Sequence, residues 1–375
     1  MHQVEAILYF SSATPSARPT GFDLRTIAIQ KYLPTGFSID VISLDLMAHT
    51  LRAGAKRHRP SIWTTWPPPL PFMIRRQDAL AILDQIADKL VGPARIIIGS
   101  MELAPLLVPL RKRYPEARII FDMRDRLSRQ AAQKIAADKP LQNGKNFIRY
   151  ILLRSWEALV YKLSNAVILL SETDRPKNSK LLPKTHFINN GLPSIRKCTP
   201  SRPGAPFTFL FLADFSYEPN RKAFDLLVRE VAPYLNAETF IDVAGRGSES
   251  ILANDLPRAV RIMGTVDDLN VVLESATAVV APLQQGTGIK NKVVESMTAG
   301  RAVITTNIGN DGIGAVDSKE IFLTKDSNEI LAVIERLSMD VKSRHAVEIA
   351  GRDLVVKKFN DTWNASKMAQ ILHVK

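Results

Sequence analysis

Short, continuous apolar segments alternate with longer amphipathic segments along this chain, and this alternation is the strongest constraint on its fold. The apolar segments are rich in Ile, Val, Leu and Phe and lack the strict polar alternation of a half-exposed strand. Strands that are apolar on both faces are typical of parallel sheets covered by helices on both sides. We therefore predict strands at 4–10, 38–43, 94–99, 117–121, 165–170, 207–212, 239–244, 260–263, 278–281 and 302–305. Helical spacing of apolar residues fills the segments between them, such as 22–32, 102–113, 147–163, 220–234, 266–275, 290–299 and 327–338.

The alternation stops once, at residues 193–206, where four prolines and one glycine fall within fourteen residues. Such composition is typical of an exposed linker between domains. We therefore predict a doubly wound α/β domain at 1–195, a Pro-rich linker at 196–206, and a second such domain at 207–358. Residues 359–375 follow as one more helix, which carries Trp363. Two such domains are expected to face each other across a ligand-binding cleft.

Composition and charge narrow the environment and the partners. The chain has 375 residues and is 46% hydrophobic, which excludes a globally disordered protein, and its single cysteine, Cys198, excludes an internal disulfide framework. A reducing cytoplasm fits best, and we find neither a secretory signal nor an apolar stretch long enough to span a bilayer. Residues 1–195 hold 28 Lys and Arg against 15 Asp and Glu, so the whole net charge of +13 lies there. That excess leaves nucleic acid, anionic lipid and an anionic substrate open as partners.

The segment 282–300, PLQQGTGIKNKVVESMTAG, has the pattern of a ligand-binding loop between a strand and a helix. Gly286 and Gly288 allow backbone N–H groups to approach a ligand closely. The following helix begins with free N–H donors and carries Lys290 and Lys292, which together favour a bound anion. Glu295, one turn further on, has two oxygens that can accept both hydroxyls of a ribose. These features describe a nucleotide site, whereas the alternative is a solvated helix with two surface lysines.

The same segment resembles the nucleotide-sugar loop of GT-B glycosyltransferases, especially the retaining family-4 (group 1) enzymes of bacterial polysaccharide and glycolipid synthesis. GIKNKVVESMTAGRAVITT is similar to their loop–helix–strand signature. FLADFSYEPNRKAFDLLVREVAPYL, DVAGRGSE and VRIMGTVDDLNVVLESATAVVAPL resemble, in order, the preceding elements of their second domain. The resemblance implies the GT-B fold, with the second domain binding the donor, the first binding the acceptor, and the last helix crossing back over the first domain.

Site residues follow from the resemblance position by position. Glu295 matches the second glutamate of the E-x7-E motif, which binds the donor ribose, and Lys290, assisted by Lys292, occupies the basic position at the donor diphosphate. Donor-loop contacts are implied for Gly286, Thr287, Gly288 and Ile289. Two positions depart from the pattern: Thr287 replaces the first glutamate of the motif, and Ala213 stands where the family usually has a glycine near the donor phosphates.

The first domain resembles the family more loosely. SATPSARPTGFDLR is similar to its glycine-bearing loop, with Gly21 facing the cleft and Arg25 in the next helix. FDMRD ends a strand where the family has an acceptor-side His or Asp, so Asp125 is our catalytic candidate and Asp122 and Arg124 are its neighbours; structural salt bridges are the alternative. VILLSETD and INNGLPS match strand-end elements near the cleft. Ser171, Glu172, Asn190 and Gly191 are therefore further candidates, for which we expect an architectural role.

Residues 51–76 contain six Lys and Arg and no acidic residue, with aromatic side chains between the cations. Amphipathic aromatics beside cations suit an anionic membrane interface. We expect Arg57, Arg59, Trp63 and Trp66 to contact a membrane, the alternative being a basic loop in solution.

The resemblance thus implies a retaining glycosyltransferase with no cofactor besides its nucleotide-sugar donor, a UDP- or GDP-sugar, and we expect it to be metal-independent. Its acceptor would be a saccharide or a lipid-linked glycan of the bacterial surface, and its place the cytoplasm, peripheral on the inner face of the membrane. Three alternatives stay open: a non-catalytic GT-B protein, an epimerase-like GT-B enzyme, and a basic nucleic-acid-binding protein, although no nucleic-acid-binding module is recognisable. The sequence does not indicate an oligomeric state.

Overall fold

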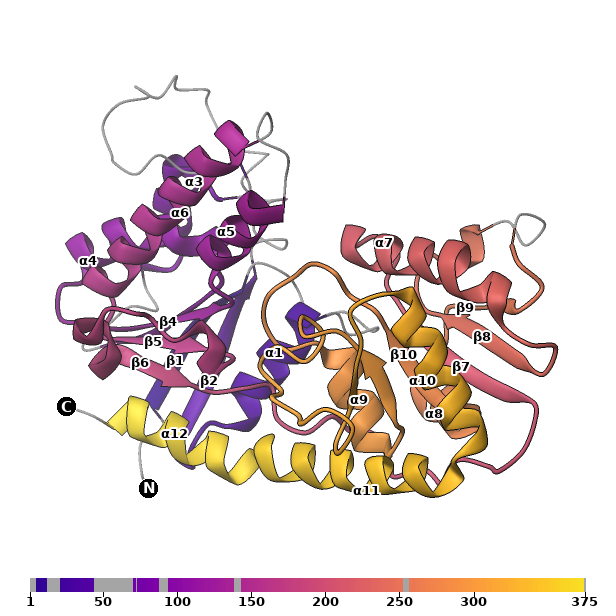
Figure 1. The fold of residues 1–375 in the computed structure, drawn as a ribbon. Coiled ribbons are helices and arrows are strands. Elements are labelled where there is room, and N and C mark those ends of the chain that lie inside the picture. The colour runs from indigo at the N-terminus through magenta and orange to yellow at the C-terminus, as the bar shows by residue number, and fades with distance from the viewer. Residues whose placement is uncertain are drawn as a thin grey trace. The chain divides into compact units, whose positions relative to one another are not determined.

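The computed structural model describes residues 5–11, 21–43, 70–71, 73–87, 94–137, 143–251 and 256–373. The chain divides into two compact units. Unit 1 comprises residues 1–190 together with 361–375, and unit 2 comprises residues 191–360. Each unit is a parallel sheet with helices on both faces, as Figure 1 shows.

The described part of unit 1 contains a six-stranded parallel sheet in the order β2-β1-β3-β4-β5-β6. Its strands are β1 (Glu5–Ser11), β2 (Phe37–Ser43), β3 (Arg95–Gly99), β4 (Arg118–Arg124), β5 (Ala166–Leu169) and β6 (Thr185–Phe187). The order reverses between β1 and β3, which makes that point the topological switch of the sheet. The register between β4 and β5 shifts between Asp122 and Arg124, at the carboxyl end of β4.

Two apolar clusters hold helices against the faces of this sheet. One joins Leu8, Ile98 and Phe121 to the helices drawn above the sheet in Figure 1. The other joins Ile7 and Ile120 to α1 and to α12, of which α12 is drawn below the sheet. Alternate residues of each strand thus serve opposite faces. The helices of unit 1 are α1 (Gly21–Lys31), α3 (Arg76–Gln85), α4 (Leu107–Arg113), α5 (Leu127–Ala137), α6 (Asn143–Leu163) and α12 (Asp361–His373), with 3-10 turns η2 (Met101–Leu106), η4 (Glu172–Asp174) and η5 (Ser179–Lys184).

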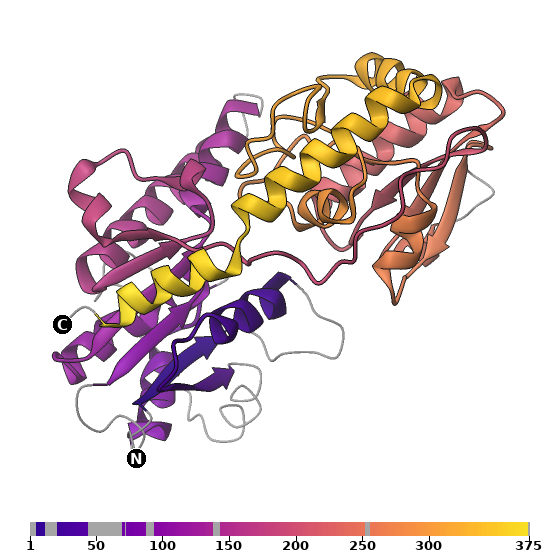
Figure 2. The same ribbon diagram turned by 90° about the horizontal axis from the view of Figure 1, so that it is seen from below.

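The helix α12 completes unit 1 although it follows unit 2 in the chain. Figure 2 shows it lying along the sheet of unit 1. Met368 and Leu372 are fully buried in the cluster formed with β1 and α1. Asp361 accepts hydrogen bonds from Lys31 Nζ and Tyr32 Oη, both at 2.7 Å. These contacts make the helix part of the core of unit 1.

The described part of unit 2 contains a second six-stranded parallel sheet, in the order β12-β11-β10-β7-β8-β9. Its strands are β7 (Phe207–Leu212), β8 (Thr239–Ala244), β9 (Val260–Gly264), β10 (Ala278–Ala281), β11 (Val303–Thr305) and β12 (Phe322–Leu323). Here the order reverses between β7 and β10. Ligands of such sheets bind beyond the carboxyl ends of the strands at the reversal.

Helices cover this sheet on both faces as well. α7 and α10 pack on one face around Phe209 and Phe211, and α8, α9 and α11 pack on the other around Leu210 and Val279. The helices of unit 2 are α7 (Glu218–Leu226), α8 (Leu269–Ser275), α9 (Asn291–Ala299), α10 (Ser327–Met339) and α11 (Val341–Lys358), with short turns η6 (Leu227–Val231, a π-helix), η7 (Ala232–Tyr234) and η8 (Ser248–Ser250).

Residues 196–206, predicted as an exposed linker between domains, belong to unit 2, and some of them pack against the rest of that unit. Cys198 and Ser201 are buried. The guanidinium of Arg301 donates to Thr199 O at 2.7 Å, and that of Arg344 donates to Ser201 Oγ at 2.7 Å. Two buried arginines therefore bind the backbone and a hydroxyl of this segment.

Candidate functional site

The predicted ligand loop of unit 2 lies at the topological switch of its sheet. The buried strand β10 ends at Ala281, residues 282–290 form the loop, and α9 begins at Asn291. Its neighbour across the switch, β7, leads through residues 213–217 into α7. The loop therefore occupies the place where doubly wound sheets bind ligands.

The loop folds around two glycines and one lysine. Gly286 has a φ of 121° and Gly288 a φ of 74°, so both adopt backbone conformations that residues with a Cβ rarely take. Lys290 Nζ donates to Gly288 O at 2.7 Å and to Thr287 O at 2.9 Å. A Cβ at residue 286 would lie 3.4 Å from Tyr217 Oη, so the residue before α7 approaches the same loop. The chain thus brings Gly286, Thr287, Gly288 and Lys290 together; Ile289, between them, is partly buried.

Lys292 links the helix after the loop to the helix across the switch. Its Nζ donates to Asn220 Oδ1 at 2.6 Å and lies 5.5 Å from the centroid of the Phe211 ring. Asn220 is itself held by a hydrogen bond from its Nδ2 to Asp214 O at 2.8 Å. Burial lowers the pKa of Lys292 to about 8, because the charged amine has lost much of its water. An anion placed beside it would restore the charged form.

Glu295 lies one turn beyond Lys292 on α9. Burial raises the pKa of this carboxyl group to about 7, and the charge of Lys292 lowers it only in part. Lys292 is its charged neighbour, and within the part of the chain that the structure describes no hydrogen bond reaches this carboxylate. Perturbed pairs of this kind are concentrated at functional sites.

The loop after β7 adds a carboxylate to the same edge of the sheet. Burial alone would raise the pKa of Asp214, but hydrogen bonds from Ser216, together with the charges of Arg246 and Lys292, lower it below the ordinary value. Arg246 lies 3.7 Å from Asp214 in the loop after β8. Ala213, the second departure from the family pattern, does not have a positive φ. Its conformation therefore does not require the glycine that the pattern leads one to expect.

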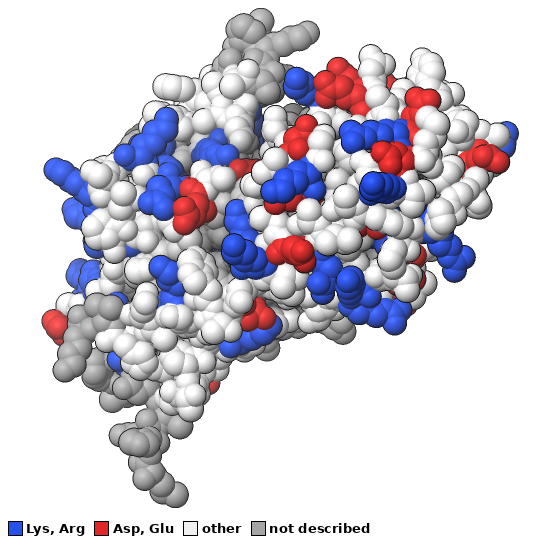
Figure 3. Space-filling view, turned by 60° about the horizontal axis from the view of Figure 1, so that its bottom comes forward, with Lys and Arg blue, Asp and Glu red and all other residues white. Residues whose placement is uncertain are grey.

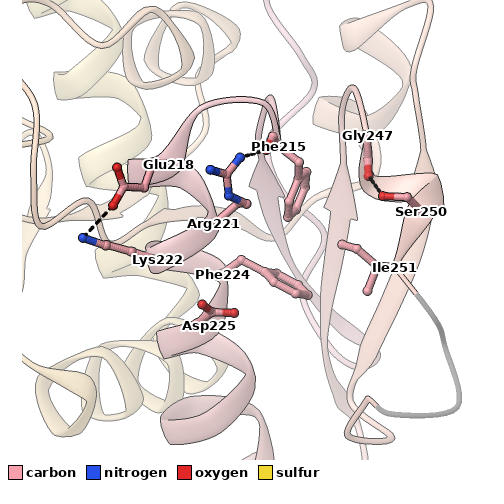
Figure 4. Close-up of a pocket in the computed structure, with 9 residues that line it drawn as sticks. All are labelled: Phe215, Glu218, Arg221, Lys222, Phe224, Asp225, Gly247, Ser250 and Ile251. Atoms are coloured by element: carbon pink, nitrogen blue, oxygen red, sulfur yellow. Dashed lines mark hydrogen bonds and ion pairs between the residues drawn. The ribbon is translucent and has the colours of Figure 1, made fainter.

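A groove of about 490 Å³ lies on the other side of α7 (Figure 4). It is lined by Phe215, Gly247 and the outward face of α7. Two of its charged side chains, Glu218 and Lys222, pair with each other at 2.9 Å. None of the predicted donor residues lines it. Asn220, which binds Lys292, lies on the opposite side of α7 from the residues of that helix that line the groove.

In unit 1 the structure buries three of the predicted cleft residues, Arg25, Asp122 and Arg124, and pairs the first two with each other. Arg25 binds Asp122 through two hydrogen bonds of 2.7 and 2.8 Å, and their side chains are 1% and 0% exposed. Arg25 also donates to Ile188 O at 2.9 Å. This is the structural salt bridge of the alternative interpretation, and it leaves neither charge exposed to a ligand. Gly21 begins α1, the helix that carries Arg25.

The carboxyl end of β4 holds the other candidates. Arg124 has a φ of 62°, which is uncommon for a residue with a side chain and marks local backbone strain. Asp125 follows it and is partly exposed. Ser100, at the end of the adjacent strand β3, also has a positive φ, of 96°. Strain is thus concentrated at the carboxyl edge of this sheet, where a ligand is expected.

The remaining candidates, which follow β5 and β6, are largely architectural. Ser171 Oγ accepts a hydrogen bond from Thr173 N and starts the turn η4, in which Glu172 is exposed. Asn190 Oδ1 accepts a hydrogen bond from Arg25 at 3.3 Å. Gly191, where unit 2 begins, has a φ of 77°.

The predicted membrane contacts Arg57, Arg59, Trp63 and Trp66 lie outside the described residues. Among the described helices, none combines the length and apolar character that a membrane crossing requires. The residues that the structure describes include no group of three or more His, Cys, Asp or Glu that could hold a metal ion. On the face drawn in Figure 3, Lys and Arg side chains are spread over both units.

Comparison with known proteins identifies the domain that holds the loop. Residues 206–340 match the model of the family described as glycosyl transferases group 1. This chain carries a glycosyl transferases group 1 domain. The group 1 domain lies within unit 2 and contains the glycine loop, Lys292, Glu295 and Asn220. No curated protein matches the chain in sequence.

Solved structures extend the likeness to the whole chain. Sucrose-phosphate synthase from Thermosynechococcus elongatus has a TM-score of 0.68 at 16% identity, over 98% of this chain and 98% of its own. HepE from Anabaena, solved in complex with UDP, has a TM-score of 0.65 at 13% identity, over 98% and 99%. A glycosyltransferase from Rickettsia africae has a TM-score of 0.63 at 14% identity, over 99% and 99%. At these identities the likeness establishes the fold, and the predicted GT-B fold around the group 1 domain is confirmed.

Proposed function

We propose that this chain is a retaining glycosyltransferase that moves a sugar from a nucleotide-sugar donor to a hydroxyl group of an acceptor. The observation that carries the proposal is the pair Lys292 and Glu295, whose pKa values burial moves to about 8 and about 7 beside a glycine loop. Both groups lack the solvation that their charged forms need. The diphosphate of a nucleotide places negative charge beside Lys292, and the ribose hydroxyls donate hydrogen bonds to Glu295.

Each part of the donor has a complementary group in the group 1 domain. The diphosphate lies at the start of α9, whose free N–H groups favour anions, with Lys290 and Lys292 beside it. The ribose hydroxyls donate to Glu295. As the bond from the anomeric carbon to the phosphate oxygen breaks, these cations and N–H groups stabilise the charge on the departing diphosphate. The acceptor oxygen bonds to the anomeric carbon from the same face, and its proton passes to the departing phosphate.

We propose a UDP-sugar as the donor, with a GDP-sugar as the second choice. HepE, whose fold resembles this chain over its full length, was solved in complex with UDP-glucose as well as with UDP. Two lysines and a helix terminus supply positive charge at the diphosphate, so we propose that transfer needs no metal ion. Thr287 stands where the family motif has its first glutamate, and we propose that it contacts the transferred sugar.

For the acceptor we propose a saccharide or lipid-linked glycan of the bacterial surface, bound by unit 1 with Asp125 beside the acceptor hydroxyl. The excess of cations in residues 1–195 supports a place on the inner face of the cytoplasmic membrane, because anionic lipid attracts basic segments. Arg57, Arg59, Trp63 and Trp66 are the proposed contacts with that surface.

The test is to titrate the protein with UDP-, GDP-, ADP- and dTDP-sugars by calorimetry and to follow donor hydrolysis. Wild type is compared with Glu295→Gln and Lys292→Met. Lys342→Met is the matched control, because it removes an exposed lysine elsewhere in unit 2.

We expect the nucleotide sugars of one base to bind the wild type and the Lys342→Met control. The Glu295→Gln and Lys292→Met variants should lose at least tenfold in affinity for them. Binding without hydrolysis or transfer would indicate a non-catalytic GT-B protein. Absence of binding across the panel would contradict the proposal.

A further inference from the structure

A groove of about 740 Å³ in unit 1 lies between α5, α6 and the segment that follows β5. We call it the α5–α6 groove. It begins where β4 and β5 end, because Arg126 and Thr173 line it. This is the carboxyl edge of the sheet, where ligands of doubly wound folds bind. The side chains that give the groove its charge are Arg126, Arg129, Arg154, Lys162, Arg175, Lys177 and Glu157.

Three of the six cations are already neutralised by carboxylates of unit 1. The pairs are Arg126 with Glu157 at 3.1 Å, Arg129 with Asp174 at 3.2 Å, and Arg175 with Glu172 at 3.1 Å. Glu157 also accepts hydrogen bonds from the backbone N and the hydroxyl of Ser128. Glu157, the carboxylate that lines the groove, is therefore satisfied within the protein.

The other three cations, Arg154, Lys162 and Lys177, are exposed and have no hydrogen bond or ion pair within the part of the chain that the structure describes. They leave the groove with an excess of three positive charges. Arg154 and Lys162 come from α6, and Lys177 comes from the segment after η4. Cations from two separate elements thus converge on one concave surface.

The shape and chemistry of the groove suit a phosphate group with an organic substituent. Its volume falls in the range of small-ligand sites. Arginine and lysine together favour phosphate, which accepts several charge-assisted hydrogen bonds at once. Tyr150 and Tyr161 also line it, so a non-polar or sugar-like substituent has aromatic surface to contact.

Exposed apolar side chains lie on α6 around the first residue of that helix that lines the groove. Phe147, Ile148 and Ile151 are 54%, 62% and 40% exposed, although they are large and hydrophobic. Phe147 and Ile151 share the face of α6 that lines the groove, because residues three, four and seven apart along a helix lie on one side. An amphiphile with a phosphate headgroup therefore fits the cations and the apolar face together.

We infer that the α5–α6 groove binds a phosphate group of a ligand other than the donor. Phosphate chemistry is common to two sources: a soluble phosphorylated saccharide, and the headgroup of a phospholipid. The groove lies in unit 1, whereas the donor loop lies in unit 2. The inference therefore does not depend on the donor assignment.

The experiment compares the full-length wild type with two triple variants that lose the same charge. The groove variant is Arg154→Gln with Lys162→Gln and Lys177→Gln. The control variant is Lys112→Gln with Lys319→Gln and Lys342→Gln, three exposed lysines that do not line the groove. Inorganic diphosphate is titrated by calorimetry in the presence of excess UDP, and binding to vesicles of phosphatidylglycerol is compared with binding to phosphatidylcholine vesicles. All six substituted side chains are exposed, so thermal unfolding is expected to stay unchanged.

We expect the groove variant to lose at least tenfold in affinity for diphosphate, for phosphatidylglycerol vesicles, or for both, while the control variant loses less than threefold. Loss for diphosphate alone assigns a soluble phosphorylated ligand, and loss for vesicles alone assigns a lipid headgroup. Equal affinities of the groove and control variants for both probes overturn the inference. Affinity for a UDP-sugar, measured on the same variants, tests the donor site separately.

Discussion

Glu295→Gln is expected to make the protein more stable at alkaline pH, although it removes a proposed ligand-binding group. Burial raises the pKa of Glu295 from its ordinary 4.5 to about 7. A carboxyl group whose pKa is raised on folding contributes most below its unfolded-state pKa, and that contribution is lost as pH rises through the folded-state pKa. The wild type therefore loses stability between about pH 4.5 and pH 7, and a neutral glutamine does not.

The magnitude follows from the same two pKa values. Each unit of difference between the folded-state and unfolded-state pKa corresponds to about 1.4 kcal/mol. Ionisation of Glu295 therefore lowers the free energy of unfolding by up to about 3 kcal/mol. For a unit of this size, 1 kcal/mol moves the melting temperature by about 2–4 °C. We expect Glu295→Gln to melt about 6–12 °C above wild type at pH 8 and only about 2–3 °C above it at pH 5.

The assay is thermal unfolding of the full chain in buffers from pH 5 to pH 8. Glu335→Gln is the control, because it replaces an exposed glutamate of α10 in the same unit. An equal melting difference at both ends of the pH range, or a Glu295→Gln variant that is less stable at pH 8, would refute the reasoning that burial of this carboxylate is uncompensated in the free protein.

Three further predictions concern binding and folding. Because burial sets the pKa of Lys292 at about 8, nucleotide-sugar affinity measured by calorimetry should fall up to tenfold per pH unit above pH 8 in wild type and stay flat there in Lys292→Met; equal slopes would argue against a contact between Lys292 and the diphosphate. Asp122→Asn leaves the charge of Arg25 buried without a carboxylate partner, so it should lower the free energy of unfolding in urea by about 3–5 kcal/mol. Asp78→Asn, in the exposed pair with Arg75, should lower it by less than about 1 kcal/mol. Leu372→Ala should cost unit 1 about 2–5 kcal/mol in the same assay, whereas Ile349→Ala, which is 61% exposed, should leave stability nearly unchanged; similar losses for both would contradict the assignment of α12 to the core.

The strands were predictable from sequence because burial on both faces leaves continuous apolar runs. Residues 207–212, 239–244 and 278–281 were predicted with the bounds that the structure shows. The edge strands β6 and β12, of three and two residues, are too short to produce such a pattern. Two predicted helices change geometry inside their span. Residues 101–106, which contain Pro105, form a 3-10 turn before α4, and α7 passes into a π-helix and then a 3-10 turn containing Pro233.

The candidate site was predictable only as far as its parts lie close together in sequence. The glycine loop, Lys290, Lys292 and Glu295 fall within one strand–loop–helix segment. The partner of Lys292 does not, because Asn220 is 72 residues away and meets it only through the order of strands β7 and β10. The same limit applies to Arg25 with Asp122, and to the arginines at 301 and 344 that bind the segment predicted as an exposed linker. The α5–α6 groove likewise joins residues from separate elements.

The place of α12 also bears on the order in which the protein is made. Domains generally fold as units during synthesis, the earlier one first. Unit 1 is an exception here, because its core lacks Met368 and Leu372 until after the whole of unit 2 has been synthesised. Its sheet must therefore remain incompletely covered while residues 191–360 are added, and the exposed face of β1, β3 and α1 is the surface on which a nascent chain would need protection from aggregation.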